Sequence, residues 1–143
     1  MTGQKIEAIP LYERALELQP ENVIAMNNLA WILSQEKGEH NKALALADKG
    51  ISLSPKYTDL IDTRGTIYMS MGQYEKAALD FKQAAERYLD TQTEKTSSTF
   101  NLAKCYRQLG RIDLSLIESY KARDLDEKNN GLTPQRERNL QKC

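Results

Sequence analysis

Apolar and small residues recur along this chain at steps of three and four, separated by charged residues and short polar turns. The clearest stretch begins at Tyr74 and predicts a helix with one buried stripe. The buried positions of this stripe are Ala77, Ala78, Phe81, Ala84, Ala85 and Tyr88. The charged residues on the other side of the helix are expected to face solvent: Glu75, Lys76, Asp80, Lys82, Glu86 and Arg87.

A shorter helix is predicted immediately before this one, beginning near Thr58. Asp59 lies in its first turn, where a carboxylate interacts favourably with the helix dipole. Gly72 is expected to end the helix in a left-handed conformation that satisfies the last carbonyl groups. Because the turn at Gly72 is short, the two helices are predicted to form an antiparallel hairpin. The apolar and small positions of the shorter helix are Leu60, Ile61, Gly65, Ile67, Tyr68 and Met71.

The same helical pair recurs on both sides in weaker form. Pro20 and Pro55 are 35 residues apart, which places about one extra residue in the polar stretch 34–41. Gly72 and Gly110 are 38 residues apart, which places four extra residues in the segment 90–96. Such spacing is typical of a stacked array in which each repeat has little core of its own. The matching positions are Met26, Leu29, Ala30, Leu33, Ala43, Ala47, Gly50 and Pro55 upstream, and Leu102, Ala103, Tyr106, Gly110, Ile112, Ser115, Ser119 and Ala122 downstream.

These shared positions resemble the tetratricopeptide repeat (TPR) family, whose repeat is a helix–turn–helix of roughly thirty-four residues. Ile61 takes the place of the family's tryptophan and Arg64 that of its leucine, so we expect the Arg64 stem to pack while the guanidinium reaches solvent. The resemblance implies an all-α fold, a right-handed superhelix (solenoid) of antiparallel helix pairs. It rests in the central repeat on Gly65, Tyr68, Gly72, Tyr74, Ala77, Phe81 and Ala84.

The resemblance implies a single TPR domain over residues 1–143. It begins with a half repeat, whose helix is expected to start near Ala8 because Pro10 is tolerated only in a first turn. Residues 1–7 are then expected to be irregular, and residues 124–131 to be a loop. Thr133 and Pro134 are typical of an N-cap and first helical residue, and predict a short terminal helix. The expected elements are a half repeat over about 5–20, repeats over 22–55, 57–89 and 96–127, and a C-terminal capping helix over 133–142.

Composition excludes several classes of function. Twenty basic and twenty acidic residues balance, which argues against binding to nucleic acid. No apolar run approaches the roughly twenty residues that span a bilayer, and the first ten residues lack a signal-peptide core. We therefore expect no membrane insertion. Cys105 is expected to be a small buried residue and Cys143 a flexible free thiol, which favours a reducing, cytoplasmic location.

The sequence carries no catalytic motif, so we expect no enzyme activity, no cofactor and no metal site. A phosphate-binding glycine loop, a nucleophile elbow and an HExxH spacing are all missing. His40, the single histidine, lies in a polar segment and is expected to be a solvent-exposed loop residue. Asp59 and Asp62 are three residues apart on one helical face, but helix-start and surface roles suit them better than catalysis.

Protein binding is the function that the resemblance implies. In TPR arrays the first helix of each pair lines the concave face, and transfer by matched position selects a candidate peptide-binding groove. Trp31 is its strongest candidate, and two interpretations of it stay open: the ring anchors a partner, or it packs against the neighbouring helix. Aspartates in the middle and basic residues towards the C-terminal end would polarise the groove. The set is Asn27, Asn28, Trp31, Gln35, Asp59, Asp62, Thr66, Met69, Asn101, Lys104, Arg107 and Gln108.

Two hypotheses follow. The first is a non-catalytic scaffold that binds a partner peptide or protein segment in the concave groove. The second is self-assembly, in which the incomplete N-terminal repeat mediates a homodimer or stacks on further repeats of a longer array. Its apolar surface would come from Ile6, Ile9, Leu11 and Leu16. The segment 27–31, with the alanine-rich helix 43–47, resembles TPR proteins common in bacteria.

Overall fold

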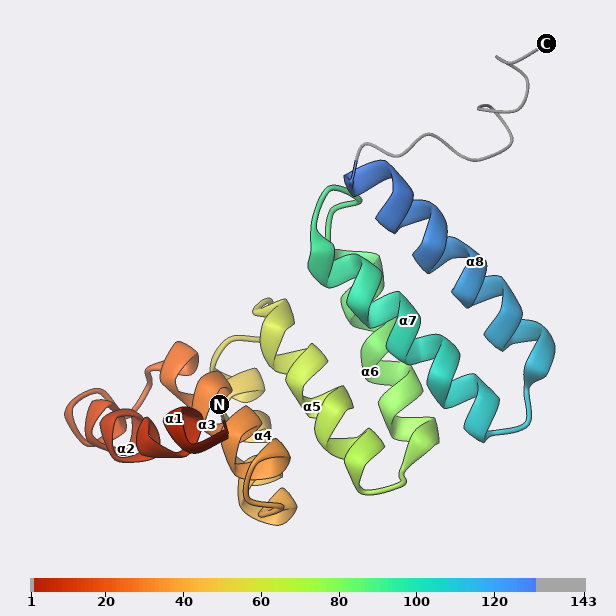
Figure 1. Cartoon of the computed structure of the whole chain (residues 1–143). Helices are drawn as coiled ribbons and strands as arrows, with labels where there is room; N and C mark the ends of the chain where they lie inside the picture. Colours follow the sequence, from red (N-terminus) through yellow and green to blue (C-terminus); the bar gives the residue numbers. More distant parts are fainter. Residues whose placement is uncertain (1, 131–143) are drawn as a thin grey trace, which may run out of the picture. The chain divides into compact units, whose positions relative to one another are not determined.

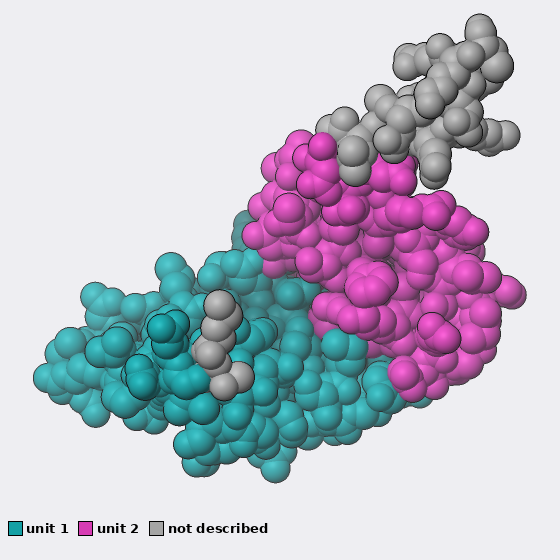
Figure 2. Space-filling model, viewed as in Figure 1, with its two compact units in different colours: residues 1–80 teal, residues 81–143 magenta. Residues whose placement is uncertain are grey.

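The computed structural model describes residues 2–130, which form α-helices and contain no β-strand (Figure 1). They divide into two compact units, Met1–Asp80 (unit 1) and Phe81–Cys143 (unit 2), with the boundary inside one helix (Figure 2). The predicted capping helix over 133–142 and Cys143 lie outside the described residues. The helices are α1 (Thr2–Glu7), α2 (Ile9–Leu18), α3 (Val23–Gln35), α4 (His40–Leu53), α5 (Thr58–Ser70), α6 (Tyr74–Arg87), α7 (Thr93–Gln108) and α8 (Ile112–Asn129).

Glycines at positive φ close the three helical hairpins. Gly38, Gly72 and Gly110 have φ values of 66°, 72° and 72°, which only glycine adopts without strain. After α5, the amide of Gln73 donates to the Tyr68 carbonyl at 2.9 Å, a bond that satisfies one of the last carbonyls of the helix. The prediction that Gly72 ends this helix in a left-handed conformation is therefore confirmed.

The extra residues of the first and third hairpins are found in different kinds of structure. After α3, the closing bond runs from the Glu39 amide to the Leu33 carbonyl at 2.8 Å, so this turn is one residue longer than the turn at Gly72. In the third repeat, α7 has 16 residues where α3 and α5 have 13. Most of the segment 90–96 is therefore an added turn at the start of α7, because it continues the helical pattern instead of forming a longer loop.

Unit 1 has a core in which α3 packs against α2, α4 and α5. Gly50 on α4 marks a close approach: a Cβ atom there would lie 2.5 Å from Leu60 Cδ1 and 3.4 Å from Met26 Sδ. A larger residue would therefore force the Leu60 side chain to move. The core cluster contains Ile9, Leu29, Ala30, Ile32, Leu33, Ala43, Ala47, Leu60 and Ile67.

The N-terminal segment corrects one prediction. Residues 2–7 form α1 instead of irregular chain, while α2 begins at Ile9 with Pro10 in its first turn, as expected. Pro10 has no amide hydrogen to donate back to α1, so α1 does not continue into α2 as one helix, but this does not prevent a short helix upstream. The Lys5 side chain of α1 reaches over α3, where it lies above Trp31.

A largely buried ion pair corrects the prediction that Asp80 faces solvent. The Arg64 guanidinium donates from Nε and Nη2 to the two Asp80 carboxylate oxygens at 2.8 and 2.9 Å, and from Nη1 to Asp48 at 3.0 Å. Asp80 is only 5% exposed. Hydrogen bonds to Asp80 raise the pKa of Arg64, so its charge is permanent. Asp80 is therefore removed from water together with its counter-ion, whereas the Arg64 side chain stays 24% exposed and extends to the half-exposed Asp48.

Unit 2 contains the end of α6 together with α7 and α8, which pack side by side (Figure 1). Helix α8 continues to Asn129. The prediction of a loop over 124–131 is therefore wrong for residues 124–129. Leu125 is buried and extends the buried stripe of Ser115 and Ala122, so continuation of the helix buries one more apolar side chain. Several large apolar residues of α8 are exposed, among them Leu116, Ile117 and Tyr120.

Candidate protein-interaction surface

The candidate residues of unit 1 lie on α3 and α5, which are neighbours in the core. Hydrogen bonds join the two helices at both ends of the surface. Thr63 Oγ1 donates to Asn27 Oδ1 at 2.6 Å, and Gln35 Nε2 donates to Ser70 Oγ at 3.0 Å. The amide groups of Asn27 and Gln35 therefore help to position α5 against α3. The unit 1 residues of the candidate set are Asn27, Asn28, Trp31, Gln35, Asp59, Asp62, Thr66 and Met69.

Trp31 packs against the core, and its role as an anchor for a partner stays a prediction. The ring is half-buried and packs against the core cluster of unit 1. It also lines a shallow pocket of about 350 Å³ together with Asn27, Asn28 and residues of α1, α2 and α5. Lys5 Nζ lies 4.3 Å from the centre of the ring, a cation–π contact. The pocket brings together Lys5, Tyr12, Asn27, Asn28, Trp31 and Thr63.

Carboxylates give the α5 part of this surface an acidic character. Asp59 and Asp62 are both half-buried. Burial, followed by the charge and hydrogen bond of Asp59, raises the pKa of Tyr57, which precedes α5. Thr66 Oγ1 donates to the Asp62 carbonyl at 3.1 Å, so its hydroxyl is held against its own helix.

In unit 2 the candidate residues lie on α7. Lys104, Arg107 and Gln108 are exposed, and Asn101 is half-buried. Lys104 Nζ lies 4.6 Å from the centre of the Phe100 ring, and that ring is 50% exposed. Phe100 was missed by the sequence analysis, although it lies 38 residues after Asp62, the spacing of Gly72 and Gly110. The acidic-to-basic gradient predicted along the groove joins residues of both units and stays a prediction.

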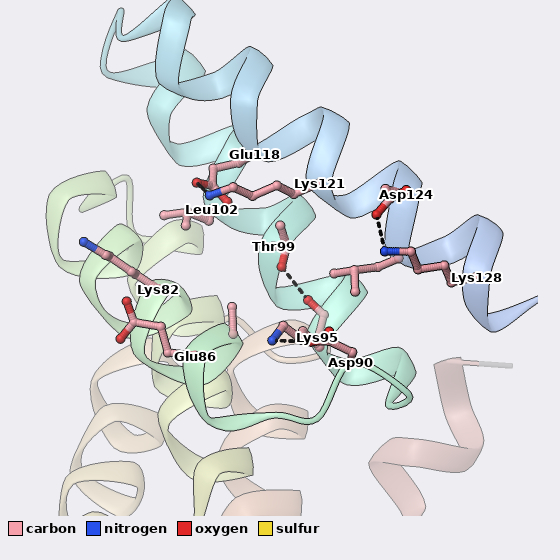
Figure 3. A pocket seen from close by; sticks show the side chains of 12 residues that line it. Lys82, Glu86, Asp90, Lys95, Thr99, Leu102, Glu118, Lys121, Asp124 and Lys128 are labelled. Atoms are coloured by element: carbon pink, nitrogen blue, oxygen red, sulfur yellow. Dashed lines mark hydrogen bonds and ion pairs between the residues drawn. The ribbon is translucent and has the colours of Figure 1, made fainter. Parts of the chain in front are cut away.

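A second pocket, which the sequence did not predict, lies within unit 2 between α6, α7 and α8 (Figure 3). It has a volume of about 350 Å³. Its walls carry ion pairs: Lys95 with Asp90 at 2.7 Å, Lys121 with Glu118 at 2.8 Å and Lys128 with Asp124 at 2.7 Å. Because these charges are paired within the wall, they present little unbalanced charge to a ligand. The added turn of α7 supplies Lys95, so the pocket depends on the longer third repeat.

Among the side chains that could act in catalysis or bind a metal ion, His40, the single histidine, makes a structural contact. His40 is half-buried at the start of α4, with Nδ1 2.9 Å from Ser34 Oγ, so the prediction of a solvent-exposed loop histidine is wrong. It begins the helix instead because the hydrogen bond to α3 holds it there. Within residues 2–130, no group of three or more histidine, cysteine or acidic side chains is arranged to hold a metal ion.

Cys105 is fully buried, as predicted, and burial raises the pKa of its thiol to about 11. In a Cys143→Ser variant at pH 8, we expect Cys105 to react with a disulfide reagent roughly two orders of magnitude more slowly than a free cysteine. The raised pKa also adds stability that is present below the unfolded value of about 8.5 and lost as the pH rises towards about 11. Reaction as fast as in urea-unfolded protein would contradict this account.

Comparisons with known proteins agree with the helical pairs described above. Two family models, both described as tetratricopeptide repeat, match residues 11–45 and 63–129. Among solved structures, MamA of strain AMB-1 is 25% identical with a TM-score of 0.72, over 89% of this chain and 72% of MamA. MamA from Desulfovibrio magneticus RS-1 is 16% identical with a TM-score of 0.76, over 88% of this chain and 68% of that one.

A thermophilic TPR protein of Thermus thermophilus, TTC0263, is 21% identical with a TM-score of 0.70, over 90% of this chain and 73% of that one. No curated protein matches the sequence. The fold and these matches define an all-α protein of antiparallel helical repeats, and the predicted fold class is confirmed. The chain belongs to the tetratricopeptide repeat family. Proteins of this family are in general non-catalytic scaffolds for protein interactions.

None of the helices within residues 2–130 is both long and apolar enough to cross a membrane.

Proposed function

We propose that this protein is a non-catalytic scaffold that binds a peptide or protein segment of a partner on the faces of α3, α5 and α7. The observation that carries the proposal is the Trp31 pocket in unit 1. There a large aromatic ring, already half-buried and fixed against the core, borders a hollow lined by two asparagine amides. A rigid ring offers contact area at little ordering cost, and amides suit the polar backbone of an extended peptide.

The α7 surface of unit 2 supports the same function by different chemistry. Phe100, Lys104 and Arg107 place an exposed aromatic ring beside two exposed cations. Such residues are common in the energetically important part of protein interfaces. We propose that the partner is not a nucleic acid, because the chain has no net charge. We also propose that the protein acts in the cytoplasm.

The test compares the partners captured from cell extract by the unmodified chain, by Trp31→Ala and by Lys104→Glu/Arg107→Glu. We expect the partners held by the unmodified chain to be lost or reduced at least about tenfold with Trp31→Ala, in line with loss of an aromatic anchor. A Lys49→Glu variant, altered on the exposed surface of α4, is the control and should capture the same partners. Partner profiles that are identical for all four proteins would contradict the proposal.

Self-assembly is the second candidate, favoured by apolar exposure on α2. Leu11 and Leu18 are 72% and 68% exposed, whereas Ile9 is buried and contributes no surface. Two exposed leucines on one short helix suit a homodimer in which α2 is covered by a second copy. Mass measurement over a range of concentrations tests it: dimers that Leu11→Lys abolishes would support self-assembly, and a strict monomer would exclude it.

A further inference from the structure

A cation site borders the Trp31 pocket and is occupied by Lys5 of the chain's own first helix. Lys5 Nζ lies 4.3 Å from the centre of the Trp31 ring and 3.9 Å from the Glu36 Oε1 carboxylate oxygen. The Glu36 side chain is only 12% exposed. An aromatic face and a largely buried carboxylate together favour an ammonium or guanidinium group between them. The site is therefore built for a positive charge, and Lys5 supplies it.

The contact that Lys5 makes is easily replaced. Its side chain is 53% exposed, and 3.9 Å is long for an ion pair, so the carboxylate holds it loosely. Helix α1 has six residues, too few to be stable without contacts to the rest of the chain. A cation–π contact at an exposed site corresponds to roughly a two- to fivefold change in an equilibrium constant. A competing cation can displace Lys5 at that small cost.

We propose that the site formed by Trp31 and Glu36 receives a lysine or arginine side chain of the protein partner, and that Lys5 occupies it in the free protein as an internal competitor. The inference rests on the proposed function, because it names what the partner presents to the Trp31 surface. Neighbouring groups fit this chemistry. Asn27 and Asn28 line the pocket that Trp31 borders and offer amides to the peptide backbone near the cation.

Arginine suits the site better than lysine. Its planar guanidinium can stack on the indole ring while it donates to the Glu36 carboxylate. The partner segment is therefore expected to bear an exposed basic side chain flanked by small residues, since the pocket is shallow. Lys5 therefore competes only with a segment that presents a cation to the site.

Trp31 is the single tryptophan of the chain, so its fluorescence reports on the site directly. The experiment titrates the full chain with the capped peptide acetyl-Gly-Ala-Arg-Ala-Gly-amide and with the same peptide carrying neutral citrulline in place of arginine. It uses the unmodified protein, Lys5→Gln, Glu36→Gln and the control Lys49→Gln. Lys49 is an exposed lysine of the same unit that does not line the pocket.

We expect Lys5→Gln to bind the arginine peptide two- to fivefold more tightly than the unmodified protein does, which is roughly the value of one exposed cation–π contact. Glu36→Gln should bind it more weakly, and Lys49→Gln should bind it unchanged. The citrulline peptide should show no dependence on Lys5. Equal affinity of Lys5→Gln and Lys49→Gln for the arginine peptide would overturn the inference. So would an equal gain for the citrulline peptide, or no fluorescence response of Lys5→Gln at millimolar arginine peptide.

These outcomes are separate from those that test the proposed function. If capture of partners from extract depends on Trp31 but the arginine peptide binds no better to Lys5→Gln, the scaffold function stands and the cation site is wrong. If capture does not depend on Trp31, the proposed function fails, whatever the peptide does.

Discussion

Replacement of Arg64 by leucine is expected to lower the free energy of unfolding by about 3 kcal/mol, although leucine is the residue that the family places there. The substitution leaves the Asp80 carboxylate, whose side chain is 7% exposed, without the guanidinium that donates two hydrogen bonds to it. A carboxylate removed from water without a cation is strongly unfavourable. Urea unfolding followed by circular dichroism measures the effect.

A double-mutant cycle isolates the pair itself. Asp80→Leu should cost less than Arg64→Leu, because the guanidinium keeps its 3.0 Å hydrogen bond to Asp48, which is half exposed. The double variant Arg64→Leu/Asp80→Leu should recover much of the lost stability, since a buried ion pair replaced by apolar residues is often neutral. Single effects that add to within about 0.5 kcal/mol would show that the two side chains do not interact.

Truncation of Phe81 to alanine is expected to cost about 3–5 kcal/mol of unfolding free energy. Phe81 is the largest of the fully buried side chains in residues 2–130, at 0% exposed. Its removal loses the transfer energy of the ring and leaves a cavity that tightly packed helices close only in part. Thermal or urea unfolding of the variant, with the helical signal as the observable, measures the loss.

Leu79 provides a matched control on the same helix. It is two residues before Phe81 and is 70% exposed, so Leu79→Ala should change the free energy of unfolding by no more than about 0.5 kcal/mol. A similar cost for both substitutions would mean that Phe81 is not in a packed core. The pair therefore tests the helical phase read from the sequence as well as the magnitude.

Local patterns were enough to predict most of the fold. The stripe from Ala77 to Tyr88 is buried as the three-and-four spacing requires, except for the half-buried Ala85, and the turn glycines have positive φ. Both features depend on residues close in the chain, where helix geometry fixes which side chains share a face. Arg64 and Asp80 could not be predicted in this way. Both are polar, and Asp80 can be buried because Arg64 lies on the neighbouring helix, 16 residues away.

The candidate surface stays a prediction, and the contacts within it could not be read from the repeat pattern. Matched repeat positions selected Asn27 and Trp31, but they could not indicate that Thr63 binds the Asn27 amide or that Lys5 covers the ring. The contact of Lys5 with Trp31 could not be predicted, because α1 is too short to show a periodic pattern. Contacts between helices distant in the sequence depend on packing, which the repeat pattern constrains only at its small and large apolar positions.

The central claim is that a partner binds on the faces of α3, α5 and α7, and site-directed photocrosslinking tests it most directly. A benzophenone amino acid is placed in turn at Met69 on α5, at Gln108 on α7, and at the control positions Lys49 on α4 and Arg123 on α8. After irradiation in cells, the account predicts adducts with the same protein partner from Met69 and Gln108 and none from Lys49 or Arg123. Adducts from Lys49 or Arg123 with none from Met69 and Gln108 would contradict it.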